Sequence, residues 1–243
     1  MPILEVSQVK KFYGGVGALT GVDLIIHEAS IMGIIGPNGA GKTTFFNCIS
    51  GYTQPSSGQI NFLGKPIVGK QPYTINRSGL ARTFQGGAVF PGLSVRENVF
   101  VGLHGHRKDY KKSGNAIEKA NELLNFVGLE TREEERAADL PHGLQSRLQI
   151  AVALATRPRL LLLDEPAAGM NPEETKELAQ LIKKIKATGV TVSIIEHNMD
   201  IIMEICQRIV VLNLGAKIAE GTPDEIKTNS LVIQAYLGRE QSA

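Results

Sequence analysis

An eight-residue segment near the start of the chain has the residue types that bind a triphosphate. Residues 36–43 read G-P-N-G-A-G-K-T, directly after the β-rich run 31–35 and directly before a helical run that begins at Thr44. Glycines allow a tight turn in which backbone N–H groups approach phosphate oxygens, and the following helix contributes its positive end. The pattern G-x-x-x-x-G-K-T in this context predicts nucleotide binding. The expected contacts are Gly36, Pro37, Asn38, Gly39, Ala40, Gly41, Lys42, Thr43 and Thr44.

Two side chains of this segment have separate tasks. Lys42 can reach the β- and γ-phosphates as a point charge, and the Thr43 hydroxyl can ligate Mg²⁺. Lys42 is expected to serve both binding and turnover, because its loss would remove a cation from the phosphates.

Two adjacent carboxylates, Asp164 and Glu165, follow a run of leucines at 160–163. A run without polar alternation is typical of a central strand buried on both faces, and open α/β sheets bind ligands at the carboxyl ends of their strands. Asp164 is suited to hold the Mg²⁺ shell through water, and Glu165 can polarise the water that attacks the γ-phosphoryl group. We therefore expect Asp164 at the metal and Glu165 as the catalytic base.

A histidine follows another buried run along the same sheet edge. Residues 191–195 are β-rich and end in Glu196 and His197. A lone histidine after a strand is usually structural, but this one shares its edge with Asp164 and Glu165. His197 is therefore predicted to donate to the γ-phosphate.

Short β-rich runs alternate with helical patterns along the chain, which is typical of a parallel sheet wrapped by helices. The clearest helix has Asn171 as its N-cap and ends at Gly189. A second helical pattern, 117–127, belongs to a stretch from 85 to 140 with little strand signal, which indicates an inserted helical subdomain. The expected strands are Ile3–Val6, Val22–Ile26, Ile31–Ile35, Leu160–Leu163, Thr191–Ile195 and Arg208–Leu212.

Composition excludes several classes of protein. Hydrophobic residues make up 42% and charged residues 21% of 243, as in ordinary globular chains. A net charge of +2 gives no support for nucleic acid as a partner, and the basic residues within 107–112 are interpreted as a solvated loop. Cys48 and Cys206 lack a paired spacing and are expected to fill the core. No apolar run is long enough to cross a bilayer, so work at a membrane would require other chains.

Taken together, these motifs resemble the ATP-binding cassette family, in the expected order and over essentially the whole chain. The resemblance implies an α/β fold, with a RecA-like P-loop NTPase core, an N-terminal antiparallel β subdomain and an inserted helical subdomain. It implies a single cassette domain over 1–243, in which 1–84 and 150–243 form the core and 85–149 the helical subdomain. The implied cofactors are ATP and Mg²⁺.

The resemblance also suggests site residues outside the phosphate segment. Tyr13, in K-K-F-Y-G-G, aligns with the aromatic residue that stacks on adenine, and Phe12 is a close competitor because either ring could offer a π face. Gln85, in R-T-F-Q, would bind Mg²⁺ and relay the nucleotide state into the helical subdomain. The implied metal site is therefore formed by Thr43, Gln85 and Asp164.

The family's signature segment, usually L-S-G-G-Q, is altered here to L-P-H-G-L-Q at 140–145. Pro141 replaces the serine and His142 replaces the first glycine, while Gly143 still opens a helix whose N-terminus can face an anion. Gly143 and Gln145 are the nucleotide contacts expected from this segment. Asn171 also departs from the family, since an aspartate is usual there.

Several segments are similar to one branch of the family, the ATPases of branched-chain amino-acid importers. They are R-T-F-Q-G-G-A-V-F-P-G-L-S-V-R-E-N-V, D-E-P-A-A-G-M-N-P, I-E-H-N-M-D and a tail in which Thr222 and Glu225 form a capping box. The similarity implies ATP hydrolysis coupled to uptake of leucine, isoleucine and valine from the cytoplasmic face of the membrane. The implied partners are a second ATPase subunit, two permease chains and an external binding protein. Importers of urea or short-chain amides are near relatives and an alternative.

Two other classes fit the sequence less well. Soluble cassette ATPases that act on DNA carry a very long coiled coil before the signature, whereas this insert is short and lacks sustained heptads; those that act on ribosomes carry two cassettes. A small GTPase or kinase would lack the signature helix and the histidine, and no N-K-x-D guanine motif occurs.

Overall fold

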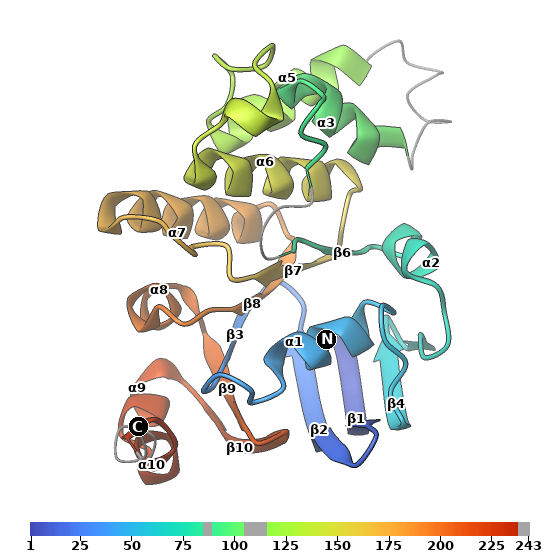
Figure 1. Cartoon of the computed structure of the whole chain (residues 1–243), viewed down its shortest axis with the longest axis vertical. Coiled ribbons are helices and arrows are strands. Elements are labelled where there is room, and N and C mark those ends of the chain that lie inside the picture. Colours follow the sequence, from blue (N-terminus) through green and yellow to red (C-terminus); the bar gives the residue numbers. More distant parts are fainter. Residues whose placement is uncertain (85–88, 105–115, 238–243) are drawn as a thin grey trace.

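Two β-sheets occupy one end of the molecule and a layer of helices the other (Figure 1). The computed structural model describes residues 1–84, 89–104 and 116–237. The first sheet is antiparallel, with the order β2-β1-β4-β5. Its strands are β1 (Pro2–Tyr13), β2 (Val16–His27), β4 (Ser57–Phe62) and β5 (Lys65–Pro66).

The second sheet has the order β10-β9-β3-β8-β7-β6 and is parallel except for β10. Every residue of β3, β7 and β8 is buried, so helices and the first sheet cover both faces of its centre. Its strands are β3 (Ile31–Ile35), β6 (Leu80–Arg82), β7 (Leu160–Asp164), β8 (Thr191–Ile195), β9 (Arg208–Asn213) and β10 (Ala216–Gly221).

The leucines of β7 supply two different cores. Leu160 and Leu162 belong to the core shared with the antiparallel sheet and α1 (Lys42–Ile49), whereas Leu161 and Leu163 belong to the core under the other helices. Because alternate side chains of a strand point to opposite faces, a strand between two cores has no polar positions. The predicted burial of this strand on both faces is thus confirmed, although β7 lies next to the edge strand β6 and not in the middle of the sheet.

The six predicted strands and the antiparallel N-terminal sheet are all present, but two strands of that sheet are longer than predicted and the other two, β4 and β5, were not among the six. β1 continues to Tyr13 and β2 begins at Val16, because the half-buried lysines and the exposed threonine of this hairpin conceal the alternation of buried residues. Ser57–Phe62 contains only two buried residues, Ile60 and Phe62, so it carries little strand signal.

The predicted helix ends agree with the structure. The Asn171 side chain accepts hydrogen bonds from the N–H groups of Glu173 and Glu174 and caps α7. Thr222 and Glu225 form the capping box of α9, as predicted. The remaining helices are α2 (Pro72–Arg77), α3 (Val95–Leu103), α5 (Ala116–Val127), η2 (Ala137–Asp139), α6 (His142–Ala155), α7 (Pro172–Ala187), α8 (Met199–Ile205), α9 (Pro223–Lys227) and α10 (Ser230–Leu237).

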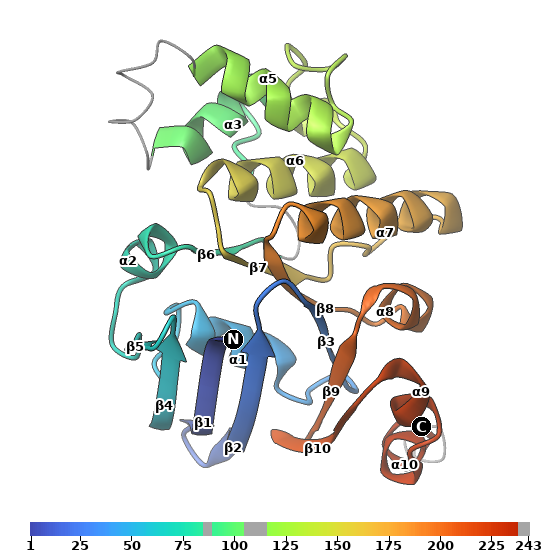
Figure 2. The same ribbon diagram turned by 180° about the vertical axis from the view of Figure 1, so that it is seen from behind.

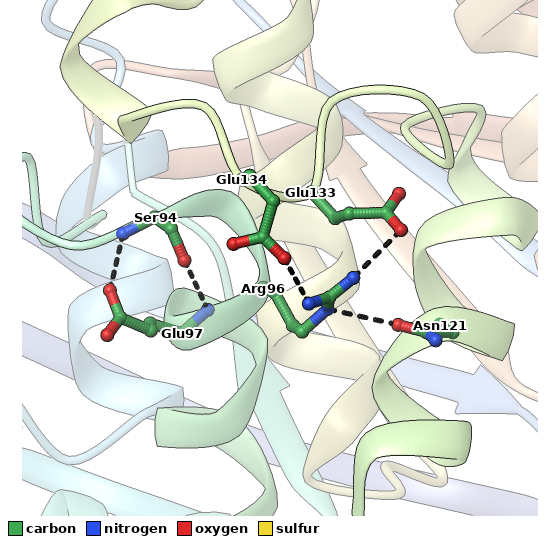
Figure 3. Close-up of polar contacts among 6 residues, drawn as sticks. All are labelled: Ser94, Arg96, Glu97, Asn121, Glu133 and Glu134. Carbon is green, nitrogen blue, oxygen red and sulfur yellow. Dashed lines mark hydrogen bonds and ion pairs between the residues drawn. The ribbon is translucent and has the colours of Figure 1, made fainter.

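Helices α3, α5 and α6 pack together at the end of the molecule away from the antiparallel sheet (Figures 1 and 2). Arg96 of α3 connects its neighbours, since it donates to Asn121 Oδ1 at 3.2 Å, to Glu133 Oε1 at 2.8 Å and to Glu134 (Figure 3). Ser94 and Glu97 form a capping box at the start of the same helix (Figure 3).

Both cysteines lie in the core, as expected. Cys48 is 3% exposed and Cys206 is 6% exposed. Burial raises the pKa of the Cys48 thiol to about 11 and that of the Cys206 thiol to about 12. The basic residues of 107–112 lie outside the described residues. In the part of the chain that is described, the helices are too short or too polar to traverse a bilayer.

Asn98 provides a test of the packing of the helical layer. Its side chain is fully buried, accepts from Phe90 N–H at 2.7 Å and donates to Ser94 O at 2.9 Å. Asn98→Ala should lower the free energy of unfolding by about 2–3 kcal/mol, because it leaves a cavity and removes the acceptor of the Phe90 N–H. Circular dichroism in urea measures this. Asn121→Ala, at an exposed partner of Arg96, is the control and should cost about 0.5 kcal/mol or less; equal losses would contradict the account.

Candidate functional site

The segment Gly36–Thr43 forms a tight loop between β3 and α1, and its glycines are needed for close backbone contacts. Gly36 has φ 151° and Gly41 has φ 99°. A Cβ on Gly36 would lie 2.1 Å from Leu212 O, and one on Gly41 would lie 2.4 Å from Ala18 O. These separations are too short for a side chain, so the backbone comes as close as only glycine permits. We call residues 36–43 the phosphate loop.

Lys42 folds back over the phosphate loop. Its Nζ donates to Gly36 O at 2.7 Å and to Pro37 O at 3.1 Å, and the residue is 6% exposed. Lys42 is also the first residue of α1, whose N-cap Gly41 offers no side-chain hydrogen bond to the first turn. The ammonium group and the N–H groups of that turn therefore lie together at one end of the loop, as binding of an anion requires.

The sheet register places the two acidic residues beside this loop. Asp164 pairs with Ile195 of β8, and Ile195 pairs with Ile34 of β3. Gly36 follows two residues after Ile34. Asp164 is therefore at nearly the same level along the strands as the start of the loop. It lies two strand spacings away, roughly 10 Å, because neighbouring strands are about 4.8 Å apart. The predicted common edge is confirmed.

Asp164 is bound by Arg82 in a buried ion pair. Arg82 Nη2 donates to Asp164 Oδ2 at 2.7 Å, and the two side chains are 4% and 2% exposed. Arg82 also donates to Asn47 Oδ1 at 2.7 Å and to Ser50 Oγ at 3.0 Å, and it lies 4.9 Å from the centre of the Phe84 ring. Removal of one partner from such a pair leaves an uncompensated buried charge, so Arg82 is integral to the site.

The second oxygen of Asp164 fits a role at a metal ion. Asp164 Oδ1 is buried and has no hydrogen-bond partner among the described residues. Buried polar atoms are normally satisfied, and a water molecule of a hydrated cation would supply the missing donor. Thr43, on the exposed side of the first turn of α1, provides a hydroxyl oxygen of the kind that Mg²⁺ prefers. Gln85, the third expected ligand, lies outside the described residues.

Glu165 has an unusual backbone and a close contact with the predicted histidine. Its φ is 48°, in the left-handed region that non-glycine residues rarely adopt, and its N–H donates to Ile195 O at 2.9 Å. His197 Nε2 lies 2.7 Å from Glu165 Oε1. The Glu165 side chain is 13% exposed and that of His197 is 44% exposed. The structure thus brings together two of the predicted catalytic side chains as a hydrogen-bonded pair.

The β1–β2 hairpin places two aromatic residues near the phosphate loop. The carbonyl of Ala18 in β2 lies against Gly41 of the phosphate loop. Val16 is two residues before Ala18 and pairs with Tyr13 across the hairpin. Tyr13 is 50% exposed and Phe12 is 46% exposed, so both rings have a surface available for stacking. Tyr13 remains the predicted adenine contact, with Phe12 as the alternative.

Comparison with known proteins identifies the chain. Residues 19–168 match the sequence profile of a family described as "ABC transporter". The chain is 44% identical to the high-affinity branched-chain amino acid transport ATP-binding protein BraF of Pseudomonas aeruginosa, over 98% of each chain. This chain belongs to the ABC transporter family. The predicted family, its α/β P-loop fold and its ATPase class are confirmed, and ATP binding follows from them.

Further relatives and solved structures support membership of the ABC transporter family. LivG of Escherichia coli (strain K12), a high-affinity branched-chain amino acid transport ATP-binding protein, is 40% identical over 98% of each chain. A nucleotide-free ATP-binding cassette from an ABC transporter superposes with a TM-score of 0.88 and 32% identity, over 97% of this chain and 99% of that one. The ADP conformation of MJ1267, an ATP-binding cassette of an ABC transporter, superposes with a TM-score of 0.87 and 30% identity, over 98% of this chain and 99% of that one. Residues 216–241 of this cassette match a profile described as "Branched-chain amino acid ATP-binding cassette transporter".

The signature segment of this cassette does not lie at its own phosphate loop. Helix α6, whose first turn belongs to this segment, lies between α3 and α5 on one side and α7 on the other, whereas the loop before α1 lies toward the sheets in both views (Figures 1 and 2). Gly143 is buried, and a Cβ there would lie 3.3 Å from Glu174 Oε1. Gln145 Nε2 donates to Leu140 O at 2.9 Å. Gly143 and Gln145 are therefore separate from the groups that the sheet edge brings together.

Sequence reasoning missed three residues of this ABC ATPase site. Arg82 stands in the R-T-F-Q segment, but its strand β6 was not recognised, so its pairing with Asp164 was not foreseen. Glu196 ends a strand, and its residue type alone indicates no role. Partial burial raises the pKa of Tyr236 of α10, while a hydrogen bond with the Gly36 backbone, at the start of the phosphate loop, acts in the opposite direction. No local sequence signal connects residues so far apart in the chain.

The phosphate loop allows a test with two glycines. Gly36→Ala should lower the free energy of unfolding by about 3 kcal/mol or more and abolish ATP binding, since the new Cβ would overlap a backbone carbonyl. Gly39→Ala is the control, because Gly39 has φ 78° but nothing lies within 4 Å of its Cβ position; it should cost only about 1 kcal/mol. Fluorescent ATP analogues can be used without interference, since the chain has no tryptophan. Full ATP binding by Gly36→Ala would refute the role of the close contact.

Proposed function

We propose that this chain is the ATP-hydrolysing subunit of an importer of branched-chain amino acids and works at the cytoplasmic face of the cell membrane. The observation that carries the proposal is the 44% identity to BraF over 98% of both chains, since BraF is a branched-chain amino acid transport ATP-binding protein. The match of residues 216–241 to a branched-chain cassette profile supports the same branch. The importer would contain two permease chains and receive its solute from an external binding protein.

In this proposal the phosphate loop binds ATP. Backbone N–H groups within residues 36–44, except that Pro37 has none, bind the phosphates. Lys42 neutralises charge on the β- and γ-phosphates, and Tyr13 or Phe12 stacks on adenine. Thr43 and Asp164, with Gln85, would hold Mg²⁺, which neutralises charge on the same phosphates when bound. Asp164 Oδ1 supports this assignment, because it finds no hydrogen-bond partner in the part of the chain that the structure describes.

Glu165 is proposed as the general base. Its carboxylate accepts a hydrogen bond from the attacking water and takes the proton as the oxygen bonds to the γ-phosphorus and the ADP oxygen leaves. His197 is held by Glu165 Oε1 and is proposed to donate to a γ-phosphate oxygen. The left-handed backbone of Glu165 turns the chain at the end of β7, which fits a residue whose position is set by function.

A second ATPase subunit, of the same or a related chain, is proposed to complete the nucleotide site. The phosphate loop contacts one side of the triphosphate, and Gly143 and Gln145 lie on α6, away from the loop of their own chain. We propose that 85–149 is a helical subdomain and that 1–84 and 150–243 are the core of one cassette domain. Helix α6 continues to Ala155, so it crosses the boundary between the two parts.

Two alternatives remain distinct from this proposal. An importer of urea or short-chain amides would use the same ATPase, since no residue of this chain is expected to contact the solute. A soluble cassette that acts on DNA or ribosomes would not associate with permeases.

Glu165→Gln tests the assignment of the base. ATP binding should persist while kcat falls on the order of 10² to 10³ or more, because the amide cannot take the proton. Steady-state phosphate release and binding of a fluorescent ATP analogue separate the two effects. Glu118→Gln on the exposed face of α5 changes the charge equally and should leave kcat unchanged. A normal rate in the Glu165 variant would exclude it as the base.

Uptake measurements test the proposed transport function. In native cells that lack the gene, wild-type chain should restore uptake of labelled leucine, and excess isoleucine or valine should compete while urea and acetamide should not. The Glu165→Gln chain should be expressed but inactive in uptake. If urea or acetamide competed for uptake and isoleucine and valine did not, the result would support an importer of urea or short-chain amides. Recovery of the chain from native cells without permeases would contradict both kinds of importer.

A further inference from the structure

Glu196 lies where the two loops that carry the catalytic pair meet. Its Oε1 accepts a hydrogen bond from Ala167 N–H at 2.7 Å, and Ala167 lies two residues after Glu165. Its Oε2 accepts from His197 N–H at 3.0 Å and from Asn198 N–H at 3.4 Å. One carboxylate therefore connects the loop after β7 to the loop after β8.

These contacts close a ring with the catalytic pair. From Glu165 the backbone leads to Ala167, whose N–H binds Glu196, and the other oxygen of Glu196 binds the backbone of His197. The His197 ring then returns to Glu165 at 2.7 Å. Because each loop is held both by a side chain and by a backbone contact, neither catalytic side chain can move without straining the other loop.

Glu196 is a buried carboxylate, and an apolar side chain would fill the same space at a lower cost in free energy. Glu196 is 4% exposed, and burial raises its pKa, with the nearby Glu165 charge acting in the same direction. In the described part of the chain, its hydrogen-bond partners are backbone N–H groups and no cation pairs with it. Burial of a carboxylate is costly unless both of its oxygens accept hydrogen bonds. We therefore attribute the presence of a glutamate at this position to the two acceptor oxygens that it supplies.

The ring is also attached to the helical layer. Ser146 of α6 is 7% exposed, and its Oγ donates to Pro166 O at 2.8 Å. Pro166 lies between Glu165 and Ala167. The loop is therefore held from one side by α6 and from the other by Glu196, so a shift of α6 is transmitted to the segment that Glu196 holds.

We propose that Glu196 is a positioning residue that fixes Glu165 and His197 relative to each other for hydrolysis. The inference rests on the proposed function, because it assigns Glu196 a role through the two proposed catalytic side chains. Glu196 itself lies behind them and acts on their backbones. Only a carboxylate meets the requirement, since each of its two oxygens faces an N–H donor, whereas a glutamine would turn an NH₂ group toward one of those donors.

Glu196→Gln is the decisive variant. It keeps shape and size but loses one acceptor, so the ring opens at Ala167 or at His197. The kcat for ATP hydrolysis should fall about 10- to 100-fold, as expected when reacting groups are displaced by a fraction of an ångström to about 1 Å. The KM for ATP and the binding of a fluorescent ATP analogue should change by about twofold or less, because the phosphate loop is not part of the ring. Glu204→Gln, on the exposed face of the adjacent helix α8, is the matched control and should leave kcat unchanged.

A double variant separates positioning from general structural damage. In a His197→Ala background the ring is already open, so adding Glu196→Gln should reduce kcat by about twofold or less. A full additional loss in that background, or an unchanged kcat in the single variant, would overturn the proposal. Glu196→Asp keeps the charge but shortens the reach by one methylene; it should lower kcat with unchanged KM, and it decides the question should Glu196→Gln fail to fold. If the wild-type chain hydrolyses no ATP, the proposed function fails, and that result is distinct from both outcomes.

Discussion

The pairing register of β7, β8 and β3 is the constraint on which the site depends. Asp164, Ile195 and Ile34 lie side by side across the three strands, so the carboxylates and the phosphate loop meet at one edge although more than a hundred residues separate them in the chain. A slip of one residue would turn each side chain to the opposite face. The four leucines of β7 bury both faces of the strand and would do so in either register. Asp164 distinguishes the registers, because a slip would remove its carboxylate from Arg82 and leave that buried charge unpaired.

The polar groups at that edge are in turn held by contacts from several elements. Arg82 approaches Asp164 from β6 and also binds Asn47 of α1 and Ser50, the C-cap of that helix, while Glu196 binds the loop after β7 from the end of β8. These buried contacts restrict movement at the edge, since each of them would be expensive to break. The site is thus fixed by buried charges around it as much as by the phosphate loop itself.

The sequence predicted the parts of the fold that depend on local patterns. The phosphate loop, the buried strand β7, the helix cap at Asn171 and the buried cysteines are all determined by neighbouring residues or by strong hydrophobicity. The family and the fold class also followed from motifs, and the comparisons confirm them. The common edge of Asp164 and the loop could be foreseen because parallel strands present their carboxyl ends together.

What could not be predicted depends on contacts between distant segments. Arg82 pairs with a residue 82 positions away, on a strand of only three residues whose burial gives no periodic signal. Ser57–Phe62 forms a strand because β1 offers it a partner, although its own residues are mostly exposed. The roles of Tyr13, Gly143 and Gln145 depend on a nucleotide and on a second subunit, so they stay predictions. The burial of both native thiols has a practical consequence: maleimide reagents attack the thiolate, which is scarce at neutral pH when the pKa is near 11 or 12. The unmodified chain is therefore a ready background for attaching fluorophores or spin labels to single cysteines introduced at the surface, with no need to replace Cys48 or Cys206 first.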